Sequence, residues 1–387
     1  MANTKYKLNS RGYYEAKVWD GTYTSTGAKH RKSIVSKKSS ADLEKKVSAF
    51  RRKIEEMEVA EINITFGEYS RRWFEIYKQT KEINTQKMYK TCVYKYLTPL
   101  DDIRLIDIKH SHFQQVINEN SEHPKTCKNI RLTFSQIIKS AVRDRYLPHS
   151  AIEDVTMDIS MPKYQKPQKR ALTALETECV MKADLDSRKR AFISVLYYCG
   201  LRRGEALALT SEDFDWKKNT VNISKVIVFD NNTPILKPYP KSDNGIRIIP
   251  LPDASVSVLK DYVTDCEGFL FKGQDKPYLT ETGYKRMWES IITSMNIAAG
   301  YNPQAKKNRI EKPIQGLTAH VFRHNYCTQL CYQIPTISTK KIAQLMGDTE
   351  KVVLNIYSHI LEEQENVSGA INNAFSIGQK SDKNRTL

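Results

Sequence analysis

Five short motifs in the second half of the chain bring together residue types that could cleave a phosphodiester. A guanidinium group can hold two phosphate oxygens and keeps its charge, and a lysine or histidine can protonate a leaving sugar oxygen. A tyrosine phenol can form a covalent bond to phosphorus that conserves the bond energy for rejoining. The motifs are Gly200-Leu-Arg202-Arg-Gly-Glu205, Lys241-Ser-Asp-Asn-Gly245, His320-Val-Phe-Arg323-His324, Leu345-Met-Gly-Asp348 and Tyr357-Ser-His359. In this order they predict a site that cuts a nucleic-acid strand without a metal ion.

The spacing within the motifs lets several of these side chains face one point. Arg202 and Glu205 are three residues apart at the start of a predicted helix, so that Glu205 can brace the arginine through a hydrogen bond. His320 and Arg323 have the same spacing on a second predicted helix. Lys241 directly precedes a turn signal, and we expect this loop to deliver a proton donor over a bound phosphate.

Each of these residues also has an ordinary structural explanation. Tyr357 is one of 21 tyrosines and, taken alone, is more typical of a packing residue. Lys241 alone is typical of a solvent-exposed lysine, and a histidine three residues before an arginine is a weak signal. We base the catalytic interpretation on the order and spacing of all five motifs together.

The composition favours a polyanionic partner. Lysine and arginine number 61 against 44 acidic residues, which gives a formal charge of +17. Such an excess suggests a polyanion, most simply nucleic acid, but a protein with a merely basic surface would give the same count. At 387 residues the chain is too long for one ordinary core and predicts two or three domains.

Other features of the sequence argue against several classes of protein. The longest apolar run, Ala191–Leu201, is well short of the roughly 18 residues that cross a membrane, and the first residues form no apolar signal segment. The seven cysteines include no CxxC pair, so we expect neither a zinc site nor a disulfide framework. These features predict a cytoplasmic protein in a reducing environment, with no membrane partner.

The first 60 residues predict a small basic domain. Residues 13–19 and 31–37 alternate like strands, and residues 41–58 predict a helix. A small sheet with basic and aromatic side chains could enter a DNA groove as a ribbon, and the ordinary alternative is a solvated basic face. The residues expected to make this contact are Lys17, Trp19, Arg31 and Lys32.

Residues 65–155 predict a helical domain with basic surfaces. Thr65 and Glu68 form a capping-box pattern at the start of its first helix. The aromatic residues of that helix recur at helical spacing and predict core packing: Phe66, Tyr69, Trp73 and Tyr77. Two amphipathic helices, residues 86–97 and 125–145, carry basic residues that either contact phosphates or form a solvated face. These residues are Lys87, Lys90, Lys95, Lys125, Lys128, Arg131 and Lys139.

A short basic segment separates this domain from the rest of the chain. Residues 160–170 contain two prolines and four basic residues and predict an extended linker. Residues 171–378 mix helices with a β region over 220–228 and 235–251, in which Asn244-Gly245 is a hairpin-turn signal. The fold predicted for the whole chain is mainly α with small β elements, an α+β class.

The motifs together resemble those of the tyrosine recombinases, the phage integrase family. Residues 171–375 look like the catalytic domain of that family, with the arginine, histidine-arginine and tyrosine motifs in the family's order. Residues 65–150 are similar to its helical core-binding domain. Residues 1–60 look like the arm-binding domain of integrases from conjugative transposons and some temperate phages. The resemblance therefore covers nearly the whole chain.

The resemblance implies a role for each motif. Arg202 and Arg323 would bind the scissile phosphate, and His320 would assist proton movement. Lys241 would be the general acid. Tyr357 would attack the phosphorus to give a 3′-phosphotyrosine and a free 5′-hydroxyl. The supporting residues would be Glu205, His324 and His359.

Two assignments stay open at this stage. Lys237 is a rival for Lys241 because it is predicted on the same hairpin. The family usually has histidine or tryptophan at the position nine residues before the tyrosine, where this chain has Asp348. A carboxylate there would repel a phosphate unless it is protonated or turned to a backbone donor or an arginine.

The resemblance also implies a biological role and partners. It implies a site-specific integrase that integrates or excises a mobile element without ATP, metal or another cofactor. Its partners would be core and arm sites of duplex DNA, three further copies in a tetramer, and a DNA-bending excisionase. The segment Gly369–Ile377 has an apolar face and would pack on a neighbouring subunit or on its own domain.

Two other functions are alternatives to the integrase. One is a type IB topoisomerase, which shares the chemistry. The basic N-terminal domain argues against it, because simple relaxation needs no second DNA site. The other is a protein that binds DNA without cleaving it, disabled at Asp348.

Overall fold

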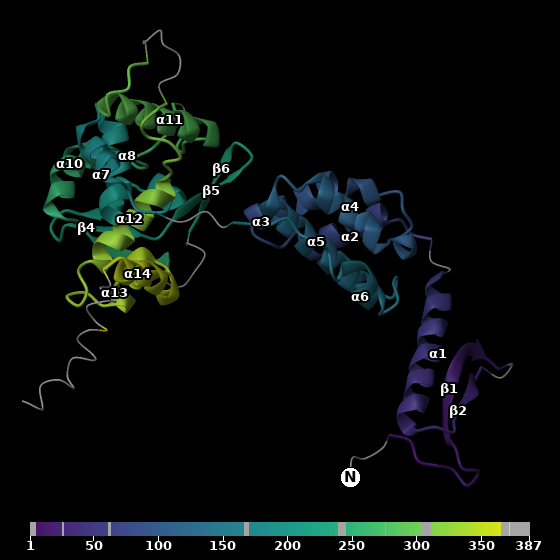
Figure 1. The fold of residues 1–387 in the computed structure, drawn as a ribbon. Coiled ribbons are helices and arrows are strands. Elements are labelled where there is room, and N and C mark those ends of the chain that lie inside the picture. Colours follow the sequence, from purple (N-terminus) through teal and green to yellow (C-terminus); the bar gives the residue numbers. More distant parts are fainter. Residues whose placement is uncertain are drawn as a thin grey trace, which may run out of the picture. The chain divides into compact units, whose positions relative to one another are not determined.

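The structure, a computed structural model, describes residues 5–24, 27–60, 63–165, 170–238, 245–274, 276–303, 311–364 and 371. It divides into two compact units, Met1–Lys166 and Pro167–Leu387 (Figure 1). Within the described ranges, many helices accompany three small antiparallel sheets, which confirms the α+β prediction. None of the described helices is long and apolar enough to cross a membrane. The finer division into an arm-binding domain, a core-binding domain and a linker stays a prediction.

The N-terminal part of the first unit is a two-stranded sheet with one helix. β1 (Tyr14–Tyr23) pairs antiparallel with β2 (Lys29–Ser36), and α1 (Ser40–Ala60) follows. The helix begins after Ser39, whose hydroxyl accepts a hydrogen bond from the Asp42 amide at 3.1 Å. These elements agree with the predicted strands and helix. The sheet and the helix share a small buried cluster of Val18, Leu43 and Val47.

Strand pairing divides the basic residues of this sheet between its two faces. Trp19 lies opposite Arg31, and Lys17 lies on the same face of β1 as Trp19. Lys32 lies on the other face, where its Nζ is 5.6 Å from the centroid of the Phe50 ring on α1. A DNA groove in contact with the sheet face that carries Trp19 would therefore contact Lys17 and Arg31 but not Lys32.

The rest of the first unit is helical. Its elements are α2 (Phe66–Tyr77), α3 (Ile83–Thr91), a π-helical turn (Cys92–Tyr96), 3-10 turns (Thr98–Leu100 and Leu105–Asp107), α4 (His110–Glu119), α5 (Pro124–Arg143) and α6 (Ala151–Thr156). The predicted capping box at the start of α2 is present. The Thr65 hydroxyl accepts the Glu68 amide at 3.2 Å, and the Glu68 carboxylate accepts the Thr65 amide at 2.9 Å.

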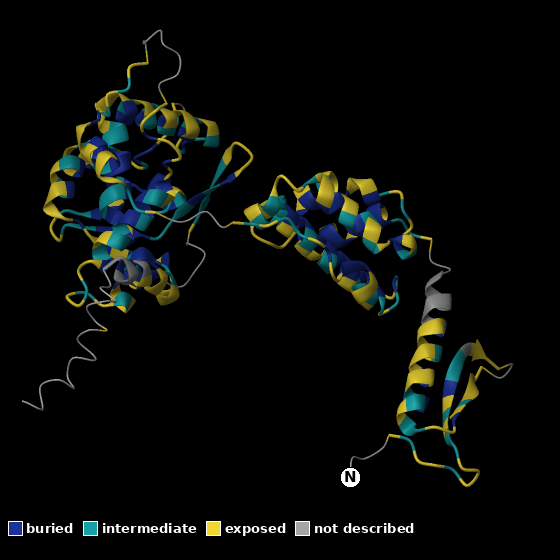
Figure 2. Ribbon diagram, viewed as in Figure 1, coloured by how far each residue is buried: buried dark blue, intermediate teal, exposed yellow. Residues whose placement is uncertain are grey.

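Aromatic and aliphatic side chains together build the core of this helical part, whose buried residues are dark blue in Figure 2. Phe66, Tyr69 and Trp73 are buried as predicted. Tyr77 was expected in the same core but is 37% exposed, because it ends α2 beyond the buried stretch of that helix. The basic residues predicted to contact phosphates lie at exposed or half-buried positions, and their contacts with DNA stay a prediction: Lys87, Lys90, Lys95, Lys125, Lys128, Arg131 and Lys139.

The second unit surrounds two small sheets with helices. Its helices are α7 (Ala174–Lys182), α8 (Ser187–Cys199), α9 (Arg203–Leu207), a 3-10 turn (Ser211–Asp213), α10 (Asp253–Thr264), α11 (Glu281–Ala298), α12 (Ala319–Cys331), α13 (Thr339–Met346) and α14 (Glu350–Gln364). Its strands are β3 (Phe214–Asp215), β4 (Thr220–Ile223), β5 (Val226–Asp230), β6 (Thr233–Lys237) and β7 (Arg247–Pro250).

The strand pairing corrects the expected hairpin around Asn244-Gly245. β5 and β6 form one two-stranded hairpin, whereas β7 pairs with β4 in the three-stranded sheet β3-β4-β7. The strands on either side of the turn signal therefore belong to different sheets. Asn244 itself lies outside the described residues, so that the turn is not assigned.

Gly200 ends α8 and sets the direction in which the chain leaves toward Arg202. It has a left-handed conformation (φ 60°), which glycine adopts without strain. A Cβ at this position would lie 2.4 Å from the Tyr326 ring of α12. A Cβ at Gly204 would lie 2.4 Å from the carbonyl oxygen of Ile227 on β5. The two glycines of the first motif thus let α12 and β5 approach the backbone around Arg202 closely.

We expect Gly200→Ala to destabilise the second unit more than Gly268→Ala. Both glycines have a positive φ, but a Cβ at Gly268 would meet no atom within 4 Å. Gly268→Ala is therefore the control, and its loss of folding stability measures only the backbone cost of about 1–2 kcal/mol. Gly200→Ala should lose a further amount of about 1–3 kcal/mol, because its new methyl group overlaps with Tyr326. Urea unfolding followed by tryptophan fluorescence measures both variants. Equal losses of stability would contradict the close contact with Tyr326.

Candidate active site

Arg202 is held at the start of α9 by a buried carboxylate. Its Nη1 donates to Oε1 of Glu205 at 2.8 Å, and its backbone amide donates to Oε2 of Glu205 at 3.0 Å. The spacing of three residues thus places the two side chains in contact, as the sequence predicts. Glu205 is only 1% exposed, and a buried carboxylate needs strong positive partners to remain ionised.

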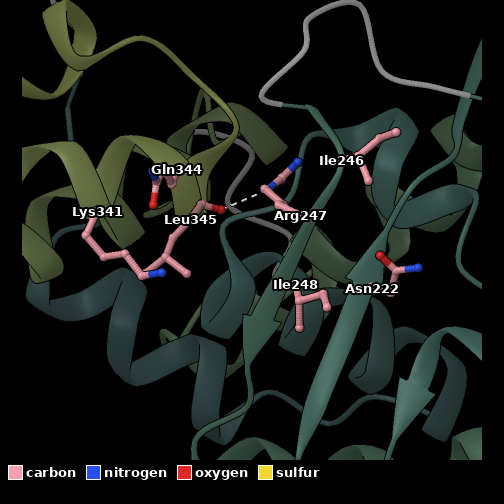
Figure 3. Close-up of a pocket in the computed structure, with 7 residues that line it drawn as sticks. All are labelled: Asn222, Ile246, Arg247, Ile248, Lys341, Gln344 and Leu345. Carbon is pink, nitrogen blue, oxygen red and sulfur yellow. Dashed lines mark hydrogen bonds between the residues drawn. The ribbon is translucent and has the colours of Figure 1, made fainter.

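Arg247, the first residue of β7, is the second positive partner of Glu205. Its Nη2 donates to Oε2 at 2.7 Å and its Nη1 to Oε1 at 3.3 Å. Its Nε donates to the Leu345 carbonyl at 2.8 Å, drawn as a dashed line in Figure 3. Arg247 is not among the residues predicted from the sequence. The available signal was the alternation of β7, which puts Arg247 and Ile249 on the buried face of the sheet.

An open groove of about 520 Å³ lies beside this contact (Figure 3). The β-sheet side is lined by Asn222, Ile246, Arg247 and Ile248, and the α13 side by Lys341, Gln344 and Leu345. The hydrogen bond from Arg247 to Leu345 joins the two sides. Arg247 therefore links the sheet both to α13 and to the carboxylate that braces Arg202.

Arg323, on α12, is almost completely buried. Its Nη1 donates to the Gly200 carbonyl at 3.0 Å, and its Nη2 donates to the Met346 carbonyl. These carbonyls lie at the C-terminal ends of α8 and α13, where backbone oxygens lack partners within their own helix. The partial negative charge at two helix ends thus holds the guanidinium group.

One carboxylate oxygen joins the two motif arginines. Oδ2 of Asp348 accepts a hydrogen bond from Nη2 of Arg323 at 2.9 Å and one from Nη2 of Arg202 at 3.1 Å. The Nη2 of Arg202 also donates to the Gly347 carbonyl at 2.8 Å. The Asp348 carboxylate thus turns to both arginines through Oδ2 and to a backbone donor through Oδ1, which accepts the Thr349 amide at 3.2 Å.

The arginines keep both carboxylates ionised. Burial alone would raise the pKa of Glu205, but the hydrogen bond and charge of Arg247, with the charge of Arg202, hold it below its usual value. Burial would also raise the pKa of Asp348, and the hydrogen bond and charge of Arg323, with Arg202, outweigh that effect. Burial and the charge of Arg202 lower the pKa of Arg323, yet a guanidinium stays protonated at neutral pH. Three arginines and two carboxylates leave the network with one positive charge.

Tyr357 lies within α14. Its side chain is half-buried and packs on a cluster formed by α12, α13 and α14, whose buried members include Cys327, Cys331, Ile342, Met346 and Val353. The same three helices and their junctions carry Arg323 and Asp348. The tyrosine is therefore attached to the packed element that holds part of the arginine network.

The structure describes only some of the other residues predicted for the site. His320 is exposed in the first turn of α12, and His324 is half-buried one turn later. Lys237 ends β6. Lys241, the side chain of His359 and all of the segment Gly369–Ile377 except Ile371 lie outside the described residues. The structure thus brings together Arg202, Glu205, Arg323 and Asp348, and adds Arg247 to them.

Sequence comparison identifies the family of the protein that carries this network. Residues 165–364, more than half of the chain, match the phage integrase family. The chain belongs to the phage integrase family. Its curated relatives are tyrosine recombinases, and the protein is such a recombinase, an enzyme of a family that cleaves and rejoins DNA. Among the described residues, no group of three or more histidine, cysteine or acidic side chains could hold a metal ion.

The relatives of this integrase-family chain are distant but cover it well. A XerC-like tyrosine recombinase from Caldanaerobacter subterraneus subsp. tengcongensis is 24% identical over 394 residues, which cover 96% of this chain and 99% of the relative. A tyrosine recombinase from Thermosipho africanus is 24% identical over 294 residues, 73% of this chain and 90% of the relative.

Solved structures of integrases share the fold of this family member. The Tn1549 transposon integrase in complex with a circular intermediate DNA matches with a TM-score of 0.60 and 17% identity, over 78% of this chain and 100% of that one. A lambda integrase dimer bound to a core site matches with a TM-score of 0.51 and 14% identity, over 91% of this chain and 94% of that one. The predicted resemblance to transposon and temperate-phage integrases is thereby confirmed.

We expect Arg247→Met to destabilise the second unit by about 3–5 kcal/mol, because Glu205 would stay buried and charged with one partner fewer. Arg286→Met on the exposed surface of α11 is the matched control and should change stability by less than about 0.5 kcal/mol. Urea unfolding measures both.

A second variant tests the cause of that loss. Replacing both partners, Glu205→Gln with Arg247→Met, removes the buried charge and should restore part of the stability. A double variant no more stable than Arg247→Met would show that the ion pair is not the source of the loss.

Proposed function

We propose that this recombinase is a site-specific integrase that integrates and excises a mobile element through a 3′-phosphotyrosine intermediate. The observation that carries the proposal is the meeting of Arg202 and Arg323 at a single anionic oxygen, Oδ2 of Asp348. A point where two guanidinium groups share an oxygen anion suits a scissile phosphate, whose charge rises in the transition state. Membership of a family of tyrosine recombinases supports the same chemistry.

In the proposed reaction, the Tyr357 hydroxyl oxygen attacks the phosphorus while the bond to the 5′ oxygen of the next nucleotide breaks. Arg202 and Arg323 neutralise the charge on the non-bridging oxygens. His320 moves the phenol proton, and Lys241 gives a proton to the leaving 5′ oxygen. Attack by a 5′-hydroxyl then rejoins a strand and frees the tyrosine. No ATP is needed, because the phosphotyrosine ester conserves the energy of the broken bond.

The first unit supplies the proposed binding of arm and core sites in the DNA. Lys17, Trp19 and Arg31 share one face of the N-terminal sheet and would meet the arm site. The basic residues of the helical part would contact phosphates of the core site. We also propose a tetramer on DNA, with the segment Gly369–Ile377 packing on a neighbouring subunit, and an excisionase that bends the DNA.

We expect wild-type protein to become covalently attached to a nicked duplex that spans the joined ends of its mobile element, and Tyr357→Phe to form no such complex. The change removes only the attacking oxygen, so that binding of the same duplex should be retained. Denaturing gel electrophoresis measures the covalent complex. Tyr332→Phe, at a tyrosine that is 48% exposed, is the matched control and should retain cleavage.

The same assay separates the alternative functions. No covalent complex with wild-type protein would favour a protein that only binds DNA. Relaxation of a plasmid that lacks the element's ends would favour a topoisomerase. A complex that persists in Tyr357→Phe would assign the nucleophile to another residue.

Sulfur in place of the bridging 5′ oxygen distinguishes the two candidate general acids. A thiolate leaves without a proton because a thiol has a pKa of about 8.5. We expect Lys241→Ala to cleave the ordinary substrate about 10²–10⁴-fold more slowly than wild type and to recover on the sulfur substrate. Lys237→Ala should show no such recovery in single-turnover cleavage. The opposite pattern would assign the proton transfer to Lys237.

A further inference from the structure

The Nη2 groups of the two motif arginines use both of their hydrogens within the protein. On Arg202, one hydrogen goes to the Gly347 carbonyl and the other to Oδ2 of Asp348. On Arg323, one goes to the Met346 carbonyl and the other to the same Asp348 oxygen. Each Nη2 has only two hydrogens to give. A phosphate oxygen can therefore reach this shared point only when the Asp348 oxygen leaves it.

Acceptors other than Asp348 also hold the two guanidinium groups. Without Asp348, Arg202 keeps the Glu205 carboxylate and one backbone carbonyl, and Arg323 keeps two backbone carbonyls. These acceptors are backbone carbonyls at the ends of helices and the buried carboxylate of Glu205, so that their positions are fixed by the fold. Oδ1 of Asp348 accepts the Thr349 amide at 3.2 Å, and the side chain is 27% exposed after the C-terminal end of α13, so that Oδ2 has solvent to turn into when it leaves the arginines.

We propose that Asp348 is an internal competitor of the scissile phosphate and makes cleavage depend on fully docked DNA. The inference rests on the proposed function, in which Arg202 and Arg323 bind that phosphate. With Asp348 in contact, the pair of arginines and the carboxylate carry one positive charge, and with it displaced the pair offers two. A phosphodiester that contacts only this site must compete with the Asp348 carboxylate for the two arginines. A duplex that also contacts the rest of the protein gains enough binding energy there to displace the carboxylate.

The opposite role for Asp348 makes an opposite prediction. If its carboxylate were required to orient the arginines, removing it would loosen both guanidinium groups and weaken anion binding. If it competes with the anion, removing it strengthens binding, because one repulsive charge at hydrogen-bond distance is lost. Anion affinity in Asp348 variants therefore decides between the two roles.

The test is binding of inorganic sulfate to the full-length protein, measured by isothermal titration calorimetry at neutral pH. We expect Asp348→Asn and Asp348→Ala to bind sulfate at least about tenfold more tightly than wild type. Glu350→Gln is the matched control, because it removes a nearby carboxylate that accepts from Thr339 and does not contact the arginines. It should bind like wild type. Adding Arg323→Lys to Asp348→Asn should abolish the gain, which places the sulfate between the arginines.

Equal or weaker sulfate binding in the Asp348 variants would overturn the inference. Asp348→Asn keeps the size of the side chain, so that it decides the question if the alanine variant fails to fold. The outcome is separable from that of the proposed function. A gain in sulfate affinity without any covalent complex at Tyr357 would reject the recombination chemistry but keep the competing carboxylate. A covalent complex without a gain would reject only the inference about Asp348.

Discussion

Two guanidinium groups that share one oxygen atom repel each other, and the second unit is organised around holding them together. Arg323 is almost fully buried, so that solvent does little to screen its charge, and Arg202 is half-buried. The fold supplies the compensation from three sources: the Glu205 carboxylate, the Asp348 carboxylate, and carbonyls at the C-terminal ends of α8 and α13. The C-terminal ends of α8 and α13 therefore contribute dipoles, and the two carboxylates contribute negative charge.

Glu205 has the central place in this arrangement because it connects a local contact with a distant one. It braces Arg202 within α9 and pairs with Arg247 from β7, which in turn bonds the Leu345 carbonyl of α13. The network thus runs from the first motif through the sheet to the helix that precedes Asp348. A displacement of any of these elements changes the position of an arginine.

The charges of the site and of the whole chain act over different distances. The chain carries a formal charge of +17, but the paired network of the site has a net charge of only +1. Long-range attraction of DNA must therefore come from the lysines and arginines spread over the two units. The site itself acts at hydrogen-bond distance, where geometry and not total charge decides what binds.

The sequence by itself determined the features that arise from neighbours in the chain. The three-residue spacing of Arg202 and Glu205, the capping box at Thr65 and the helix end at Gly200 depend on local hydrogen bonds and backbone conformation, and the order of the motifs identified the family. Contacts between distant segments were decided only by the tertiary structure. Arg247 meets a carboxylate 42 residues away in the sequence, and Asp348 bonds an arginine 146 residues away. The pairing of β7 with β4 and the partial burial of Tyr357 on α14 likewise depend on how helices and sheets pack. Side-chain types alone do not encode which distant partner completes a buried charge.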